Sequence, residues 1–94
     1  MNNQEILEQF KKEFSHVYEW HDEAGTEYPE HAHKDKVSIF ITLGEVDFAF
    51  TETGEKKKVS AGERFDVPVG AKHTAFVGPA GSRYIVGEMI EGDS

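Results

Sequence analysis

The 94-residue chain contains no cysteine. Disulfide bonds are therefore excluded, and we expect a protein that folds in the reducing cytoplasm. Long apolar runs are also missing, because no stretch approaches the ~18 residues of a membrane-spanning helix. The first residues, Met1–Glu5, lack the basic and apolar regions of a signal peptide, so we expect no export signal. These absences together favour a cytoplasmic location.

Positive charge is scarce in this sequence. There are 10 lysine and arginine residues against 18 aspartate and glutamate residues, which gives a formal charge of −8. Nucleic acids and anionic membrane surfaces both attract basic proteins, so we expect neither as a partner. Apolar residues make up 37% of the chain and include seven phenylalanines. This composition supplies one modest core, so we expect a single domain over residues 1–94 and a homodimer that buries additional surface.

The spacing of apolar residues predicts one helix near the start of the chain. The residues that recur at intervals of three and four are Ile6, Leu7, Phe10 and Phe14. This stripe indicates a helix over about residues 4–14, capped by Asn2 or Asn3. Because the helix is too short to form a domain, we expect it to pack on an open end of a sheet or on a partner subunit.

The rest of the chain, about residues 16–90, consists of short β-rich segments separated by turn signals. The predicted strands cover about residues 16–20, 26–33, 37–43, 46–51, 56–59, 64–67, 73–77 and 83–90. Gly44 and the Gly78–Gly81 segment are among the predicted breaks. About eight short strands favour a β-sandwich or a small barrel. We expect residues 91–94 to form a frayed tail.

Three of the five histidines fall into two spaced patterns. These patterns are Gly25-x5-His31-x-His33 and Gly62-x5-Pro68-x-Gly70-x2-His73. Side chains in a strand alternate between its faces, so His31 and His33 should point to the same side. Imidazole nitrogen is a common ligand for zinc, iron, copper and nickel. Three convergent imidazoles leave coordination positions open, which is typical of a reactive metal site rather than a closed structural one.

These two patterns resemble the motifs of the cupin superfamily, G-x5-H-x-H-x3,4-E-x6-G and G-x5-P-x-G-x2-H-x3-N. The resemblance covers residues 25–77. It implies an all-β fold, a cupin-type jelly-roll β-barrel or sandwich, here with a short N-terminal α-helix. It also implies that His31, His33 and His73 hold a divalent metal inside the barrel. The chain departs from the motifs at two positions, where Val37 replaces the glutamate and Val77 replaces the asparagine.

The missing glutamate leaves three interpretations open. In the first, the three histidines alone bind the metal, as in the thiol dioxygenases of the superfamily. In the second, another carboxylate replaces the glutamate. Asp35 and Glu27 are candidates because they share strand parity with the histidines, and Glu30 also precedes them. Glu27 is more simply a solvated carboxylate at the end of a strand. In the third, the site is empty and the histidines are vestigial.

A site of three neutral imidazoles leaves the 2+ charge of the metal uncompensated, so a small anionic or oxygen-bearing ligand gains more from binding it. The predicted cofactor is a divalent transition metal, namely iron, nickel, zinc, cobalt, copper or manganese. The resemblance implies a dioxygenase-like enzyme or another metalloenzyme that catalyses isomerisation, decarboxylation or a lyase reaction on a small anionic metabolite. Two alternatives stay open: a non-catalytic module that binds or senses a sugar or acid, and a structural barrel packed solid around a vestigial site.

Several other side chains have more than one interpretation. Arg64 either reaches an anionic substrate or forms a surface ion pair. Tyr28 is expected to shape the entrance of the barrel. On the last strand, Tyr84 shares one face with Glu88, and Ile85 and Met89 share the other face. The alternation does not say which of these two faces is directed inward.

Overall fold

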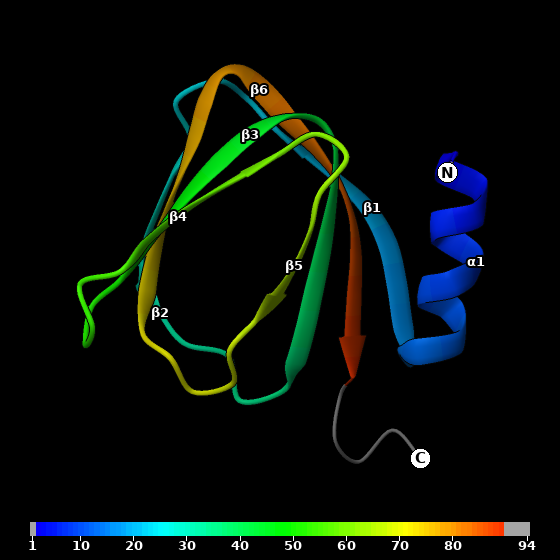
Figure 1. Cartoon of the computed structure of the whole chain (residues 1–94), viewed down its shortest axis with the longest axis horizontal. Coiled ribbons are helices and arrows are strands. Elements are labelled where there is room, and N and C mark those ends of the chain that lie inside the picture. The colour runs from blue at the N-terminus through cyan, green and yellow to red at the C-terminus, as the bar shows by residue number, and fades with distance from the viewer. Residues whose placement is uncertain (1, 90–94) are drawn as a thin grey trace.

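The computed structural model describes residues 2–89. Its elements, in chain order, are α1 (Asn3–Glu13), β1 (His16–Asp22), β2 (Glu27–His31), β3 (Lys36–Phe50), β4 (Lys56–Ser60), β5 (Arg64–Val67) and β6 (His73–Met89). The strands surround a common interior, and the helix lies outside it beside β1 (Figure 1). The predicted all-β class with a short N-terminal helix is confirmed. The predicted last residue of the final strand, Ile90, and the predicted tail at 91–94 lie outside the described residues.

Two long strands connect the two halves of the barrel. β3 and β6 pair antiparallel from Lys36 opposite Met89 to Phe50 opposite His73. β1 and β5 extend the sheet at one end of this pair, and β2 and β4 extend it at the other end. Each long strand therefore contributes to both halves of the barrel, one half with β1 and β5 and the other with β2 and β4.

The prediction of breaks at Gly44 and at Gly78–Gly81 was wrong, because β3 and β6 run through them. The described residues therefore form six strands in place of the predicted eight. Gly44 and Gly81 have positive φ angles of 80° and 73°, and the β3–β6 register shifts on both sides of Gly44. Such glycines and register shifts bend a strand without ending it. A Cβ atom on Gly44 would lie 1.9 Å from the carbonyl oxygen of Gly81, so the two bends meet backbone to backbone.

Helix α1 packs on the outer face of the barrel. The Asn2 side chain caps it by accepting a hydrogen bond from the Glu5 amide at 2.9 Å, as one of the two predicted caps. The predicted apolar stripe is buried in a small cluster with Ile85 of β6. Gly87 permits this contact, since a Cβ atom there would lie 2.4 Å from the ring of Phe14. The helix was expected to pack on a sheet or on a partner subunit, and it packs on the sheet of its own chain.

The main core lies inside the barrel. It consists of buried residues from both halves, chiefly Val37, Ile39, Ile41, Val46, Phe48, Phe50, Val59, Val67, Val77 and Val86. Among the described residues, no helix has the length and apolar character needed to cross a membrane.

Candidate metal centre

The structure brings His31, His33 and His73 together at one end of the barrel interior. His31 is the last residue of β2 and lies opposite His73, the first residue of β6. The ring centroids are 4.4 Å apart for His31 and His73, 4.9 Å for His31 and His33, and 5.4 Å for His33 and His73. One nitrogen from each ring lies within 4.8 Å of the other two. Two ligands at about 2.1 Å from one ion lie at most about 4.2 Å apart, so the three rings have to move slightly closer together to share a metal ion.

Backbone contacts hold the two motif segments in place. The Gly70 amide donates a hydrogen bond to the carbonyl oxygen of His33 at 2.8 Å, which ties the Pro68–Gly70 turn to the segment after β2. Gly70 has a φ angle of 78°, a backbone conformation that residues other than glycine rarely adopt. The glycine of the second motif therefore helps to bring the third histidine to the first two.

Two of the imidazoles have a defined tautomer. The Nδ1 atoms of His31 and His73 each lie 2.8 Å from a backbone carbonyl two residues earlier, Pro29 and Ala71 respectively. A carbonyl oxygen only accepts hydrogen bonds, so each Nδ1 carries the hydrogen and donates. In the neutral ring the lone pair then lies on Nε2, where it is available to a metal ion. A hydrogen bond from the other ring nitrogen to a carbonyl, as seen here for Nδ1, is what metal-binding histidines usually make.

The surroundings of His33 favour its neutral form. Burial lowers the pKa of this imidazole, and the neighbouring His31 and His73 lower it further. His73 itself is 1% exposed, and the other two rings are half-buried. A neutral imidazole offers a lone pair, so His33 is disposed to bind a cation rather than to carry positive charge.

No carboxylate among residues 2–89 joins this group of donor atoms. Val37, at the glutamate position of the motif, is a buried part of the cavity wall. Asp35 lies in the β2–β3 loop and lines a smaller neighbouring hollow. Glu27 does not lie on the histidine face that strand parity gave it: it pairs with the exposed Phe76 and is itself exposed, as a solvated carboxylate at the end of a strand.

A β-bulge explains the position of Glu27. The β2–β6 register shifts between Tyr28 and His31, so three residues of β2 oppose two of β6. Tyr28 therefore pairs with the buried Ala75 and faces inward, in the place that simple alternation gave to its neighbour. Tyr28, which was expected to shape the entrance of the barrel, lines the cavity.

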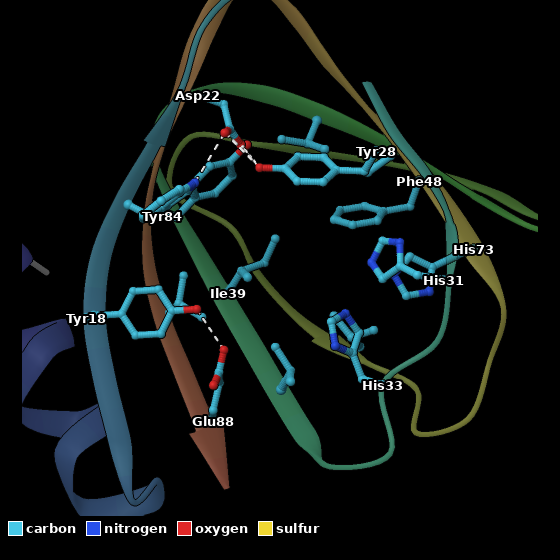
Figure 2. A pocket seen from close by; sticks show the side chains of 16 residues that line it. Tyr18, Asp22, Tyr28, His31, His33, Ile39, Phe48, His73, Tyr84 and Glu88 are labelled. Carbon is cyan, nitrogen blue, oxygen red and sulfur yellow. Dashed lines mark hydrogen bonds between the residues drawn. The ribbon is translucent and has the colours of Figure 1, made fainter. Parts of the chain in front are cut away.

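The histidines open onto a cavity of about 460 Å³, so the barrel is not packed solid. The middle of the cavity is apolar and is lined by Val37, Ile39, Val46, Phe48, Val67, Ala75 and Val86. The rest of the cavity is lined by a group that we call the aromatic wall: Tyr18, Trp20, Asp22, Tyr28, Tyr84 and Glu88. Tyr28 lies beside His31, with ring centroids 6.4 Å apart, and its hydroxyl is directed at Asp22 (Figure 2). The cavity therefore has a histidine end and an aromatic, carboxylate-bearing region.

Hydrogen bonds within the aromatic wall join phenols to carboxylates. The Tyr18 hydroxyl donates to Glu88 at 2.7 Å, and the Tyr28 hydroxyl donates to Asp22 at 2.7 Å (Figure 2). Burial raises the pKa of the Tyr18 phenol, and the hydrogen bond to Glu88 raises it further. The Tyr28 pKa is raised in the same way by burial and by Asp22. Both phenols therefore keep their protons in neutral solution.

The residues that β1 contributes to this wall were not predicted from the sequence. A signal was present, because Tyr18 and Trp20 alternate on one face of the strand predicted over residues 16–20, and Asp22 continues the alternation beyond it. The open question about the last strand is now answered: Tyr84 and Glu88 face the cavity, and Ile85 faces the helix. Arg64 does not line the cavity and forms an ion pair with Glu13 of the helix, the second of its two predicted roles.

No protein-family model and no curated protein matches this sequence. Solved structures do match it. The DMSP lyase DddQ from Ruegeria pomeroyi DSS-3 aligns with a TM-score of 0.69 and 23% identity over 83% of this chain. An RmlC-like cupin from Shewanella frigidimarina NCIMB 400 aligns with a TM-score of 0.64 and 26% identity over 82% of this chain and 68% of its own. A Bacillus subtilis oxalate decarboxylase, described for its Mn(II) centres, aligns with a TM-score of 0.68 and 18% identity over 83% of this chain.

The fold and the histidine cluster define a single-barrel cupin. The chain has the cupin fold that the resemblance of its two motifs implied. It spans 39% of DddQ and 22% of the oxalate decarboxylase. The shared fold establishes the architecture of the site and leaves its chemistry to be argued from its residues.

Proposed function

We propose that this cupin binds a divalent transition metal through the Nε2 atoms of His31 and His73 and one ring nitrogen of His33. The observation that carries the proposal is the convergence of these nitrogens, with two tautomers set by backbone carbonyls, on an open cavity. Imidazole donors fit iron, nickel, zinc, cobalt, copper or manganese. Three protein ligands would leave positions free for an exogenous ligand.

The proposed activity is that of a metalloenzyme acting on a small anionic metabolite. A metal bound there would supply Lewis acidity towards a carboxylate or another oxygen donor. The residues of the chain supply the rest: the apolar belt around Phe48 excludes water, and the phenol–carboxylate pairs hold protons across the cavity. Oxygenation is our first choice of reaction. Isomerisation, decarboxylation and lyase chemistry are the others.

The test begins with elemental analysis of protein purified without chelators. We expect about one metal ion per chain, lost in His73→Ala and retained in His21→Ala, a matched substitution of an exposed histidine outside the cavity. Metal at 100 times its Kd stabilises a protein by about 2.7 kcal/mol, which corresponds to a rise in Tm of roughly 10 °C or more for a domain of this size. Absence of metal, with no change in Tm on adding Fe²⁺, Ni²⁺, Zn²⁺ or Mn²⁺, would refute the proposal.

A second candidate is a module that binds a small molecule without turnover. It is favoured by one observation: the phenols of Tyr18 and Tyr28 are engaged by carboxylates and have raised pKa values, so neither is available as a base at neutral pH. A screen of small carboxylic acids by both binding and turnover separates the two. Binding that saturates with no product formed, under air and with metal loaded, selects the binding module.

We also propose that the protein is a cytoplasmic homodimer. Large apolar side chains on its surface support this, namely Leu43, Val69 and Phe76, each at least 45% exposed. Light scattering at micromolar concentration tests the dimer, and a monomeric mass would contradict it.

A further inference from the structure

The aromatic wall presents ring faces and carboxylates to one space. Tyr18, Trp20 and Asp22 alternate on the inner face of β1, and Trp20 lies opposite Tyr84 in the sheet. Tyr28 reaches the same region from β2, and its hydroxyl meets Asp22 (Figure 2). The Tyr18 and Trp20 side chains are 41% and 55% exposed although they line a cavity. Their rings therefore offer accessible surface to a ligand.

Three hydrogen-bond donors of this wall are already used. The Tyr18 hydroxyl bonds Glu88, the Tyr28 hydroxyl bonds Asp22, and the Trp20 indole N–H donates to Asp22 at 3.2 Å. A hydroxyl that donates to a carboxylate leaves its oxygen lone pairs as acceptors. These groups thus offer acceptor oxygens and π faces to a ligand, and no free donor among them suits an anion.

The charges around the cavity also favour a cation. Of the described residues that line it, two are carboxylates, Asp22 and Glu88, and none is lysine or arginine. Aromatic faces attract cations through their quadrupoles, by a factor of about two at exposed sites and about thirtyfold when the cation is desolvated. The arrangement of several rings with carboxylates among them is the one that binds quaternary ammonium groups.

We propose that the aromatic wall binds a small organic cation of the quaternary ammonium type. If the proposed metal site occupies the other end, the natural ligand is a zwitterion, with its anionic group at the histidines and its cationic group at the wall. The zwitterionic ligand rests on the proposed function, because it requires the metal. The cation site at the aromatic wall does not. Charge pairing at both ends would also orient the ligand in the cavity.

The test uses metal-free protein in the presence of chelator, so that it does not depend on the metal site. Choline is the probe, and 3,3-dimethyl-1-butanol is its neutral isostere, in which carbon replaces the charged nitrogen. Because Trp20 is the only tryptophan in the chain, its fluorescence reports directly on the wall. We expect choline to bind about tenfold more tightly than the alcohol.

Three variants locate the effect. Glu88→Gln should lower choline affinity about fivefold and leave affinity for the alcohol unchanged, because it removes charge and keeps shape. Tyr18→Leu should also weaken choline binding, since it removes an aromatic face. Phe76→Ala is the matched control, an exposed aromatic residue outside the cavity, and should change neither affinity. Isothermal titration calorimetry confirms each value independently of fluorescence.

Equal affinities for choline and the alcohol, or no binding of choline to folded protein, would overturn the inference. So would choline binding that Glu88→Gln and Tyr18→Leu both leave unchanged. If choline binds as expected but elemental analysis finds no metal, the cation site stands and the proposed metalloenzyme fails. If metal binds and choline does not, the proposed metal site stands and the cation site fails.

Discussion

Arg64 links helix α1 to the barrel, and its removal gives a prediction whose size can be worked out. Its guanidinium donates two hydrogen bonds to Glu13, at 2.8 and 2.9 Å, and one to Asp66 at 2.9 Å. It also lies 4.9 Å from the ring centroid of Phe10 and 5.7 Å from that of Phe14. The two partners of the main pair are 31% and 29% exposed, which limits solvent screening.

A double-mutant cycle isolates the pair. An ordered, bidentate surface pair is worth about 1 kcal/mol, and each exposed cation–π contact adds about 0.5 kcal/mol. Arg64→Met should therefore destabilise the protein by about 2 kcal/mol, and its coupling to Glu13→Gln should be about 1 kcal/mol. The matched control is the pair Lys58–Glu45, at 3.9 Å and more exposed, whose coupling should stay below about 0.3 kcal/mol.

The coupling should disappear in acid. The hydrogen bonds from Arg64 lower the pKa of Glu13 from 4.5 to about 2. Because the folded-state pKa is depressed, the stabilisation is fully present above about pH 4.5 and is lost as the pH falls towards 2. Urea denaturation followed by Trp20 fluorescence and circular dichroism, at neutral pH and near pH 2.5, measures this. A coupling that is negligible at neutral pH, or equally large in acid, would refute the reasoning.

Three further substitutions probe the fold and the site. Gly44→Ala should destabilise the protein by several kcal/mol more than Gly54→Ala. Both glycines have positive φ angles, which alone costs an alanine about 1–2 kcal/mol. Only at Gly44 would the added Cβ atom also collide with a neighbour, 1.9 Å from the carbonyl oxygen of Gly81. Equal values in chemical denaturation would show that the bends do not touch. Val37→Glu should lower the Tm of metal-free protein, since it buries a carboxylate, and should gain more from added metal than wild type. If added metal raised the Tm of Val37→Gln by the same amount, the glutamate charge would not be responsible, and residue 37 would not reach the metal. Ile85→Ala should cost about 2–5 kcal/mol by opening the contact beneath the helix, and an unchanged urea midpoint would argue against that contact.

Local patterns were sufficient to predict the helix and the histidine cluster. The apolar stripe of the helix needs only the 3.6-residue period, and the observed Asn3–Glu13 differs from the predicted 4–14 by one residue at each end. The two motifs predicted which three histidines meet, and the structure places them together. Their role as metal ligands stays a prediction.

The strand breaks could not be predicted in the same way. A glycine with positive φ can end a strand in a turn or bend a strand that continues, and the local sequence is similar in both cases. Gly44 bends β3 because Gly81 of β6 makes a matching bend beside it, with no room for a side chain between them. That contact joins residues 37 positions apart, so no local pattern contains it.

The composition of the cavity depends on a similar long-range feature. Simple alternation along β2 places Glu27 inward with the histidines, which made Glu27 one of the candidates in the second interpretation of the missing glutamate. The bulge after Tyr28 arises from how β2 registers against β6, and it exchanges the two positions. A phenol directed at Asp22 thus stands where alternation placed a carboxylate beside the histidines. Three imidazoles and the carboxylates Asp22 and Glu88 line one cavity, and with the proposed metal bound they would supply the two opposite charges that the zwitterionic ligand proposed above requires.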